Sequence, residues 1–211
     1  VRNMDIRADR MVPCGRGGGG LFFHEGAQKT YGCGVYRAKR LINRNFGRQH
    51  KMIRLRPYNV SDADKILSWS NDEKAFYKWS AGVLGEYPIT KKQFGFVNNL
   101  MAFTAIDDDE VVGFFTMRRP TESFDELRFG FVVVDPEKRG KGYGKAMLQL
   151  GTKFAKEIFG AKKISLGVFE NNESAYYCYK AVGFKDIVLE ETEKYVVLGK
   201  EWKCLELEMN L

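Results

Sequence analysis

Residues 132–146, VVVDPEKRGKGYGKA, decide the fold of this chain. The valines end an apolar run that starts near Leu127, and Asp135-Pro136 stops it, which is typical of a strand buried on both faces. After Gly144 the apolar residues recur in steps of three and one, the period of a helix packed on a sheet. The stretch therefore predicts a buried strand, a basic glycine-rich turn and a helix.

The turn has the chemistry of a phosphate-binding site. Gly140, Gly142 and Gly144 lack the Cβ atoms that would keep an anion away from the backbone, and the first N–H groups of the helix point into the gap. The spacing does not fit a Walker loop, because Lys145 is followed by Ala146 rather than by Ser or Thr, and it does not fit Gly-x-Gly-x-x-Gly either. The alternative is a tight strand-to-helix connection that binds nothing.

Two stretches resemble the GNAT superfamily of acetyl-CoA-dependent N-acetyltransferases. Arg139-x-x-Gly142-x-Gly144 is similar to the pyrophosphate-binding motif of that family, and residues 172–184, NESAYYCYKAVGF, are similar to a second family motif. The resemblance covers residues 52–211 and implies a GNAT-like (acyl-CoA N-acyltransferase) α/β fold: a mixed, mostly antiparallel sheet flanked by helices around a central β-α-β unit. It also implies acetyl transfer from acetyl-CoA, as cosubstrate and without a metal, to a primary amine by direct attack.

The resemblance further implies where acetyl-CoA binds. Its pyrophosphate is expected on the glycine-rich turn, and its pantetheine arm is expected to pair with the preceding strand like an added strand. Asn172 is expected to hydrogen-bond the pantetheine or to cap the following helix. The implied acetyl-CoA residues are Val132, Val133, Val134, Arg139, Gly140, Lys141, Gly142, Tyr143, Gly144 and Asn172.

Proton transfer is implied for two side chains. Tyr179 stands at the family position of the acid that protonates the departing thiolate, which a phenol with a pKa of about 10 can do at hydrogen-bond distance. The alternative is a core tyrosine whose hydroxyl bonds the backbone. For the base, the family's carboxylate positions on the fourth and fifth strands hold Arg128 and Gly167 here. Glu126, on the same strand face as Arg128, is the first candidate, Glu170 is the second, and a water chain is the third.

Charge divides the chain into two parts. Residues 1–51 hold 11 of the 34 Lys and Arg but 3 of the 27 Asp and Glu, so they account for the formal net charge of +7. This glycine-rich segment shows no helix or strand period. We expect a disordered extension, or residues upstream of the native start, followed by an N-acetyltransferase domain at residues 52–211. The alternative is a basic RNA-contacting arm, which would suit a non-catalytic acyl-CoA-binding module.

Shorter patterns place the other elements. Ser61 as N-cap predicts a helix start, residues 73–79 predict a second helix, and Thr90 with Gln93 predicts the capping box of a third. The acidic residues 107–110 suit an exposed hairpin tip, with a cation site as the alternative. Strands are expected near residues 53–56, 103–106, 111–117, 127–134, 164–169, 186–189 and 201–209.

The sequence does not determine which amine is the acceptor. Residues 52–57, MIRLRP, and residues 127–131, LRFGF, resemble the branch that contains ribosomal-protein N-terminal acetyltransferases, yet family branches differ widely in acceptor. A protein N-terminus and a small-molecule amine therefore both fit. Four scattered cysteines and no signal peptide lead us to expect a cytoplasmic protein, and no stretch is long enough for a membrane span. Nucleic acid is not an expected partner, whereas a homodimer is compatible with the family.

Overall fold

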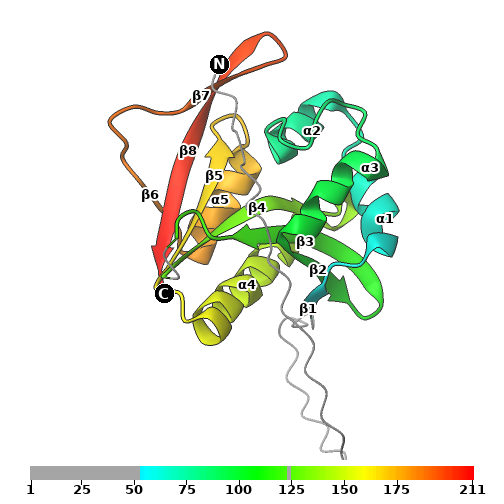
Figure 1. Cartoon of the computed structure of the whole chain (residues 1–211), viewed down its shortest axis with the longest axis horizontal. Helices are drawn as coiled ribbons and strands as arrows, with labels where there is room; N and C mark the ends of the chain where they lie inside the picture. The colour runs from blue at the N-terminus through cyan, green and yellow to red at the C-terminus, as the bar shows by residue number, and fades with distance from the viewer. Residues whose placement is uncertain (1–52, 123–124) are drawn as a thin grey trace, which may run out of the picture. The chain divides into compact units, whose positions relative to one another are not determined.

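The computed structural model describes residues 53–122 and 125–211, so the predicted leader, residues 1–51, lies outside the described residues. Within them, one sheet is flanked by helices (Figure 1). Its strands are β1 Arg54–Pro57, β2 Met101–Asp107, β3 Glu110–Arg118, β4 Glu126–Val134, β5 Lys163–Phe169, β6 Lys185–Asp186, β7 Lys194–Val197 and β8 Lys200–Asn210. The helices are α1 Ala63–Leu67, α2 Glu73–Ser80, α3 Lys91–Phe94, α4 Tyr143–Phe159 and α5 Glu173–Val182, with 3-10 turns at Val60–Asp62, Gly95–Asn99 and Pro136–Lys138.

The sheet opens between its two parallel strands. Its order is β1-β2-β3-β4-β5-β8-β6, and β7 pairs with β8. All pairs are antiparallel except β4 and β5, which helix α4 connects as a β-α-β unit. Their pairing runs only from Glu126–Lys163 to Arg128–Ser165. Beyond this point the two strands share no ladder, so their facing backbone groups are left for another partner.

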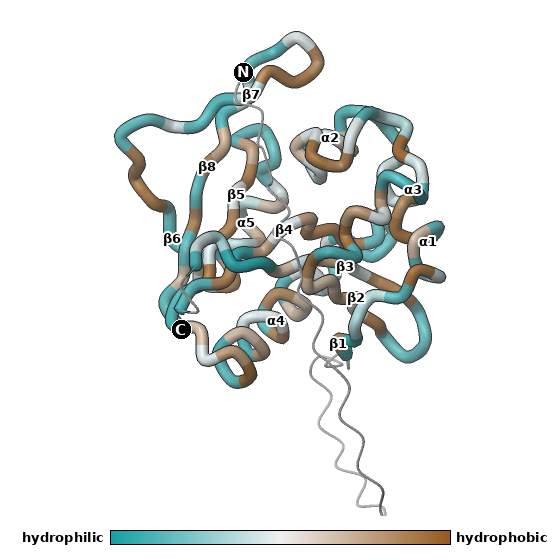
Figure 2. The backbone as a smooth tube through the Cα atoms, in the orientation of Figure 1, coloured by the Kyte–Doolittle hydropathy of each residue, from teal (hydrophilic) through white to brown (hydrophobic). Residues whose placement is uncertain are grey.

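The two faces of the sheet carry separate cores. On one face, Phe115, Leu127 and other apolar side chains pack with residues of α4 and α5. On the other face, Phe114 packs with residues of α1, α2 and α3, which stand together in Figure 1, apart from α4 and α5. Adjacent residues such as Phe114 and Phe115 serve opposite cores because side chains alternate along a strand. Figure 2 shows this as apolar colour along β3 and β4 between more polar turns.

The predicted fold class is confirmed, together with the strand-turn-helix unit at residues 127–159 and the capping box of Thr90 and Gln93. Four details differ, and the first is that the strand expected near residues 186–189 is only the two-residue β6. Asn59, not Ser61, caps the first helical segment, because its side chain accepts from the backbone of Ser61 and pairs with Asp62 in a capping box. The third helix is one α-turn that continues as a 3-10 turn. Strand β7 was missed, since it is only a four-residue edge strand.

A buried carboxylate ties the first strand to the first helix. Asp62 is 6% exposed and accepts two hydrogen bonds of 2.7 Å from Arg56, one from the backbone of Asn59 and one from Thr104. Burial alone would raise its pKa, but these hydrogen bonds outweigh burial and hold the pKa below the ordinary value. Asp62 therefore stays ionised and stabilises the fold at neutral pH.

We expect Asp62→Asn to lower the free energy of unfolding by about 2 kcal/mol at pH 7, because it leaves Arg56 without its charged partner. Urea unfolding monitored by circular dichroism measures this. A carboxylate with a lowered pKa stabilises the folded state above its unfolded-state pKa and loses this effect as the pH falls. The difference between wild type and variant should thus close below about pH 4; a difference that persists in acid would contradict the assignment.

In the part of the chain that the structure describes, no helix combines the length and the apolar character needed to cross a bilayer.

Candidate active site

The separation of β4 and β5 is reinforced by a bulge in β4. The register with β3 shifts between Phe114 and Thr116, and Phe131 has a positive φ of 47°. A bulge of this kind bends the strand and leaves one residue outside the ladder. The indole of Trp79 on α2 donates a hydrogen bond of 2.9 Å to the carbonyl of Phe131. Helix α2 is therefore fixed to the strand at the point where the sheet opens.

The glycine-rich turn forms an open cradle at the start of α4. Gly140 and Gly142 have φ values of 71° and 86°, and a Cβ on either residue would meet no atom within 4 Å. Gly142 is the N-cap of α4, and no side chain caps this end of the helix. The first N–H groups of a 17-residue helix thus lack an intrahelical partner and can bind an anion such as a pyrophosphate.

A cleft of about 540 Å³ joins this cradle to the opening in the sheet. All the predicted acetyl-CoA residues line it except Lys141, whose ammonium donates to the carbonyl of Glu137 at 2.9 Å. Residues of α2 and α5 complete the walls. The lining comprises Ala75, Lys78, Trp79, Val132, Val133, Val134, Lys138, Arg139, Gly140, Gly142, Tyr143, Gly144, Lys145, Leu148, Asn172, Ser174, Ala175, Tyr177, Cys178 and Tyr179.

The acidic hairpin between β2 and β3 braces the cradle. Glu110 forms an ion pair of 2.6 Å with Lys138, and Asp107 accepts a short hydrogen bond from the hydroxyl of Tyr143, the residue that follows Gly142. This bond, followed by burial and the charge of Asp107, raises the pKa of Tyr143. The hairpin predicted from the four acidic residues is confirmed, and two of its carboxylates hold the turn that carries the candidate phosphate site.

We expect Asp107→Asn to weaken acetyl-CoA binding by about tenfold, because it removes the charged acceptor that fixes Tyr143. Isothermal titration calorimetry with acetyl-CoA measures the effect. Asp109→Asn on the same hairpin is the matched control and should bind as the wild type does. Equal affinities for all three proteins would show that the cradle keeps its shape without this bond.

Tyr179 lies where the cleft meets the opening. Its side chain is 6% exposed and lines both spaces. Among the described residues its hydroxyl has no hydrogen-bond partner, so the alternative of a core tyrosine bonded to the backbone does not apply. Burial, and to a smaller extent Cys178, raises the pKa of Tyr179 above its ordinary value. The phenol is therefore neutral at physiological pH and keeps a proton to donate.

The opening between the strands is a narrow passage of about 50 Å³. Gly130 on β4 and Gly167 on β5 both line it, and Lys78 and Trp79 reach it from α2. The ammonium of Lys78 donates to the carbonyl of Asn171 at 2.6 Å, which ties α2 to the segment between β5 and α5. Burial lowers the pKa of Lys78, and nearby Lys74 adds to this. Lys78 thus closes the passage on the side of α2.

The carboxylates predicted as bases lie outside both spaces. Glu126 accepts a hydrogen bond of 2.7 Å from Ser165 and pairs with Lys163 at 3.1 Å. Burial opposes its ionisation, but these partners prevail and lower its pKa. Glu170 lies 3.9 Å from Lys203. Neither residue lines the cleft or the passage.

Asn172 lines the cleft and the passage, and its side chain makes no cap hydrogen bond to α5. Of its two predicted roles, helix capping is therefore absent, and its amide is available to a ligand. Sequence reasoning missed Lys78 as a site residue, and it weighed Trp79 as part of an acceptor pocket against ordinary core packing. Their spacing on α2 resembles ordinary core packing, and only the position of α2 above the opening reveals them.

The described geometry can be compared with known proteins. Residues 64–184 match the Acetyltransferase (GNAT) family. An N-alpha-acetyltransferase of Sulfurisphaera tokodaii is 30% identical over 150 residues, which cover 65% of this chain and 83% of that protein. A UPF0039 protein of Schizosaccharomyces pombe is 34% identical over 83 residues, 38% of this chain; the chain thus spans about half, 54%, of that relative.

Solved structures show the same fold. The spermidine N-acetyltransferase from Vibrio cholerae, crystallised with CoA and spermine, superposes with a TM-score of 0.63 at 17% identity, covering 75% of this chain and 95% of that one.

Proposed function

Because the chain belongs to the GNAT family of acetyltransferases, we propose that it transfers the acetyl group of acetyl-CoA to a primary amine. The observation that carries the proposal is that the cleft at the Gly142 cradle and the passage at Gly130 and Gly167 adjoin, with Tyr179 in the lining of both spaces. The cleft thus has an anion site at the cradle and an uncharged proton donor where it meets the passage. A thioester on a phosphorylated carrier fits this arrangement, because its phosphate groups suit the anion site and its departing sulfur suits the proton donor.

Each step of the proposed reaction has residues in these two spaces. The pyrophosphate binds the N–H groups at the start of α4, and the pantetheine pairs with the free backbone of Val132 and Val134. Asn172 supplies an amide to the same arm. The amine nitrogen attacks the thioester carbon, the carbon–sulfur bond breaks, and Tyr179 gives its proton to the sulfur while the attacking ammonium loses one. Tyr179 regains its proton from solvent after the products leave.

We keep Glu126 as the proposed base, and its geometry sets the form of that role. Because the carboxylate is bound to Ser165 and Lys163 and does not line the passage, it would act through water rather than directly. If so, Glu126→Gln should remove the acidic limb of the pH profile of kcat/KM. An unchanged profile would mean that Glu126 is not the base and that solvent takes the proton of the attacking amine.

The similar proteins indicate that the acceptor is an amine, but they differ in the kind of amine. One similar protein is an N-alpha-acetyltransferase, and a structural neighbour was crystallised with spermine. A protein N-terminus, as in the branch that contains the ribosomal-protein enzymes, and a small amine are thus the two candidate acceptors for this chain.

Release of coenzyme A from acetyl-CoA tests the proposed activity. The full chain is incubated with peptides that have free N-termini, with aromatic and aliphatic monoamines, and with spermidine, and free thiol is measured. Turnover with any of them establishes the enzyme and its acceptor class. Tight acetyl-CoA binding without turnover on any amine would contradict the proposal and favour an acyl-CoA-binding module.

Two further proposals concern the setting of the enzyme. Exposed apolar side chains gather late in the chain, with Val188 95% and Val196 82% exposed, and Figure 2 shows apolar colour in the same connections. Their burial would favour a homodimer, which light scattering after size exclusion can test. Among the described residues, Cys178 and Cys204 form no disulfide, and we propose a cytoplasmic protein.

A further inference from the structure

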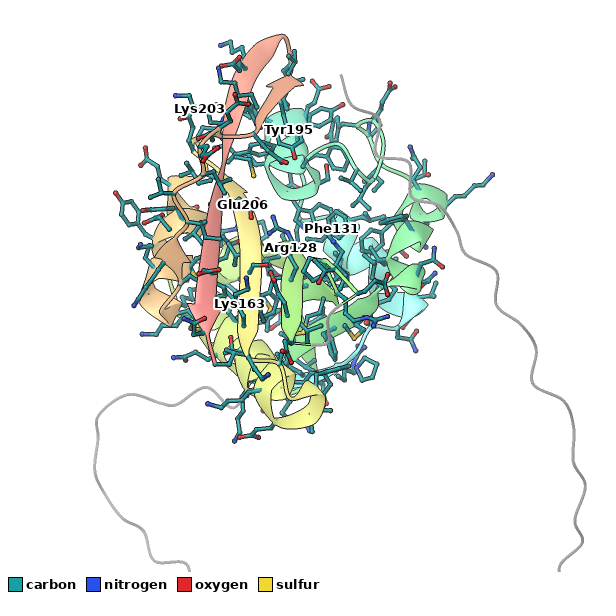
Figure 3. All side chains as sticks on the ribbon, turned by 60° about the vertical axis from the view of Figure 1, so that its left-hand side comes forward. Arg128, Phe131, Lys163, Tyr195, Lys203 and Glu206 are labelled. Carbon is teal, nitrogen blue, oxygen red and sulfur yellow. The ribbon has the colours of Figure 1, made fainter. Side chains whose placement is uncertain are left out.

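An ion pair crosses β5 beside the passage. Arg128 on β4 donates two hydrogen bonds, of 2.6 and 2.7 Å, to the two carboxylate oxygens of Glu206 on β8. Their side chains are 21% and 15% exposed. Figure 3 shows the two side chains meeting over β5, near Phe131.

The pair takes the place of a side chain that β5 lacks. A Cβ on Gly167 would lie 2.8 Å from the Arg128 guanidinium and 2.9 Å from Glu206 Oε1, and it would also crowd Cys204. Gly167 lines the passage and is the register partner of Glu206. The carboxylate of Glu206 therefore lies where a side chain of residue 167 would stand, in contact with a residue of the passage, although Glu206 itself lines neither the passage nor the cleft. Sequence reasoning sought a carboxylate on β4 or β5 and did not consider the next strand.

Stability alone does not explain the pair. A half-buried ion pair loses much of its attraction to desolvation, and apolar residues of similar size often stabilise a fold as well. The bidentate geometry also orients the carboxylate, since the planar guanidinium fixes both oxygens. Each oxygen of Glu206 accepts one hydrogen bond from Arg128, and Oε1 accepts a second, of 3.9 Å, from the thiol of Cys204, so the second lone-pair direction of Oε2 is left for a ligand.

We propose that Glu206, held by Arg128 across Gly167, binds the amine of the acceptor and aims it at the passage. The inference rests on the proposed acetyltransferase function and names the acceptor-binding group of that site. The acceptor nitrogen arrives as an ammonium, which donates charge-assisted hydrogen bonds to a fixed carboxylate, and it loses one proton to water before its lone pair attacks the thioester. The aromatic rings of Phe131 and Trp79 beside the passage suit an apolar or aromatic carbon skeleton.

A neighbouring arginine narrows the acceptor class. Arg118 is the cross-strand partner of Arg128, so both side chains leave the same face of the sheet, and among the described residues Arg118 has no ion-pair partner. The charge of Glu206 acts on both guanidinium groups, and that of Glu126 acts on Arg128 as well. Arg118 would repel a second ammonium group of the acceptor that came to lie beside it. We therefore expect the acceptor to be a monoamine, or the N-terminus of a peptide that carries no second positive charge nearby, rather than a polyamine.

Glu206→Gln tests the proposal in the full chain, with the best acceptor of the amine panel as probe. We expect kcat/KM for the amine to fall about 10- to 100-fold, mainly through KM, because a charge-assisted hydrogen bond is lost. The dissociation constant of acetyl-CoA should change less than about twofold, since the cleft is untouched. Glu208→Gln, on the same face of the same strand, is the matched control and should keep the wild-type KM.

Two more variants separate binding from folding. Arg128→Gln combined with Glu206→Gln removes both members of the ion pair together and should show the same loss of amine affinity with a normal melting transition. Gly167→Ala retains both charges but displaces them, so it should lower kcat/KM by up to about 100-fold. Phenylethylamine should exceed spermidine in kcat/KM.

The outcomes distinguish this proposal from the activity itself. If the wild type turns over an amine and Glu206→Gln keeps its KM, the role of Glu206 is refuted while the acetyltransferase stands. A preference for spermidine refutes the acceptor class. Absence of turnover on every amine, with acetyl-CoA bound, overturns the proposed function and this inference together.

Discussion

Gly142→Glu should abolish acetyl-CoA binding. The residue has a φ of 86° at the N-cap of α4, and its missing Cβ leaves open space where the cradle faces the cleft. A glutamate there would place a negative charge at the site that we assign to the pyrophosphate, and it would fill the space as well. Repulsion between like charges in such a site costs several kcal/mol, so we expect affinity to fall more than about 100-fold.

The control for this variant is Gly199→Glu. Gly199 has a φ of 70° in the turn between β7 and β8, and a Cβ there also meets no atom within 4 Å. Both variants therefore share the strain of a positive φ and the added charge, but only one affects the cradle. Calorimetry should detect acetyl-CoA binding to the Gly199 variant alone. Normal binding by the Gly142 variant would move the phosphate site elsewhere.

The candidate phosphate site could be predicted because it is encoded locally. Three glycines, a basic stretch and the start of a helix follow one another within residues 139–146, so their spacing alone places backbone N–H groups around an anion. Asn172 and Tyr179 were predicted differently, from the resemblance of residues 172–184 to a second family motif. The fold class followed from the order of these two units.

Other parts of the site depend on contacts that no short stretch encodes. The bulge at Phe131 arises from the register of β3 against β4, and its bond to Trp79 requires α2 to lie above it. Glu206 is 39 residues from Gly167 along the chain and meets it only because β8 pairs with β5. One signal was present: the alternation of Leu205, Glu206 and Leu207 puts a carboxylate opposite an apolar face. The position of Glu206 beside the passage could not be predicted from this alternation, because it depends on the pairing of Glu206 with Gly167.

Tyr179→Phe should lower kcat about 100-fold or more while acetyl-CoA binds as before, since general acid catalysis by a placed side chain contributes about that much. The variant removes one oxygen atom and keeps the ring that packs against Phe184. Single-turnover release of coenzyme A measures the chemical step, and calorimetry measures binding. Tyr176→Phe on the same helix, outside the cleft, is the matched control and should turn over normally.

The pH dependence makes the test specific. Because burial raises the pKa of the Tyr179 phenol, its proton is present throughout the range from about pH 6 to pH 9, and its own ionisation should produce no alkaline loss of activity there. The defect of Tyr179→Phe should therefore be constant across this range. A defect that disappears toward low pH would mean that solvent can protonate the thiolate, and a variant with unchanged kcat would remove Tyr179 from the mechanism.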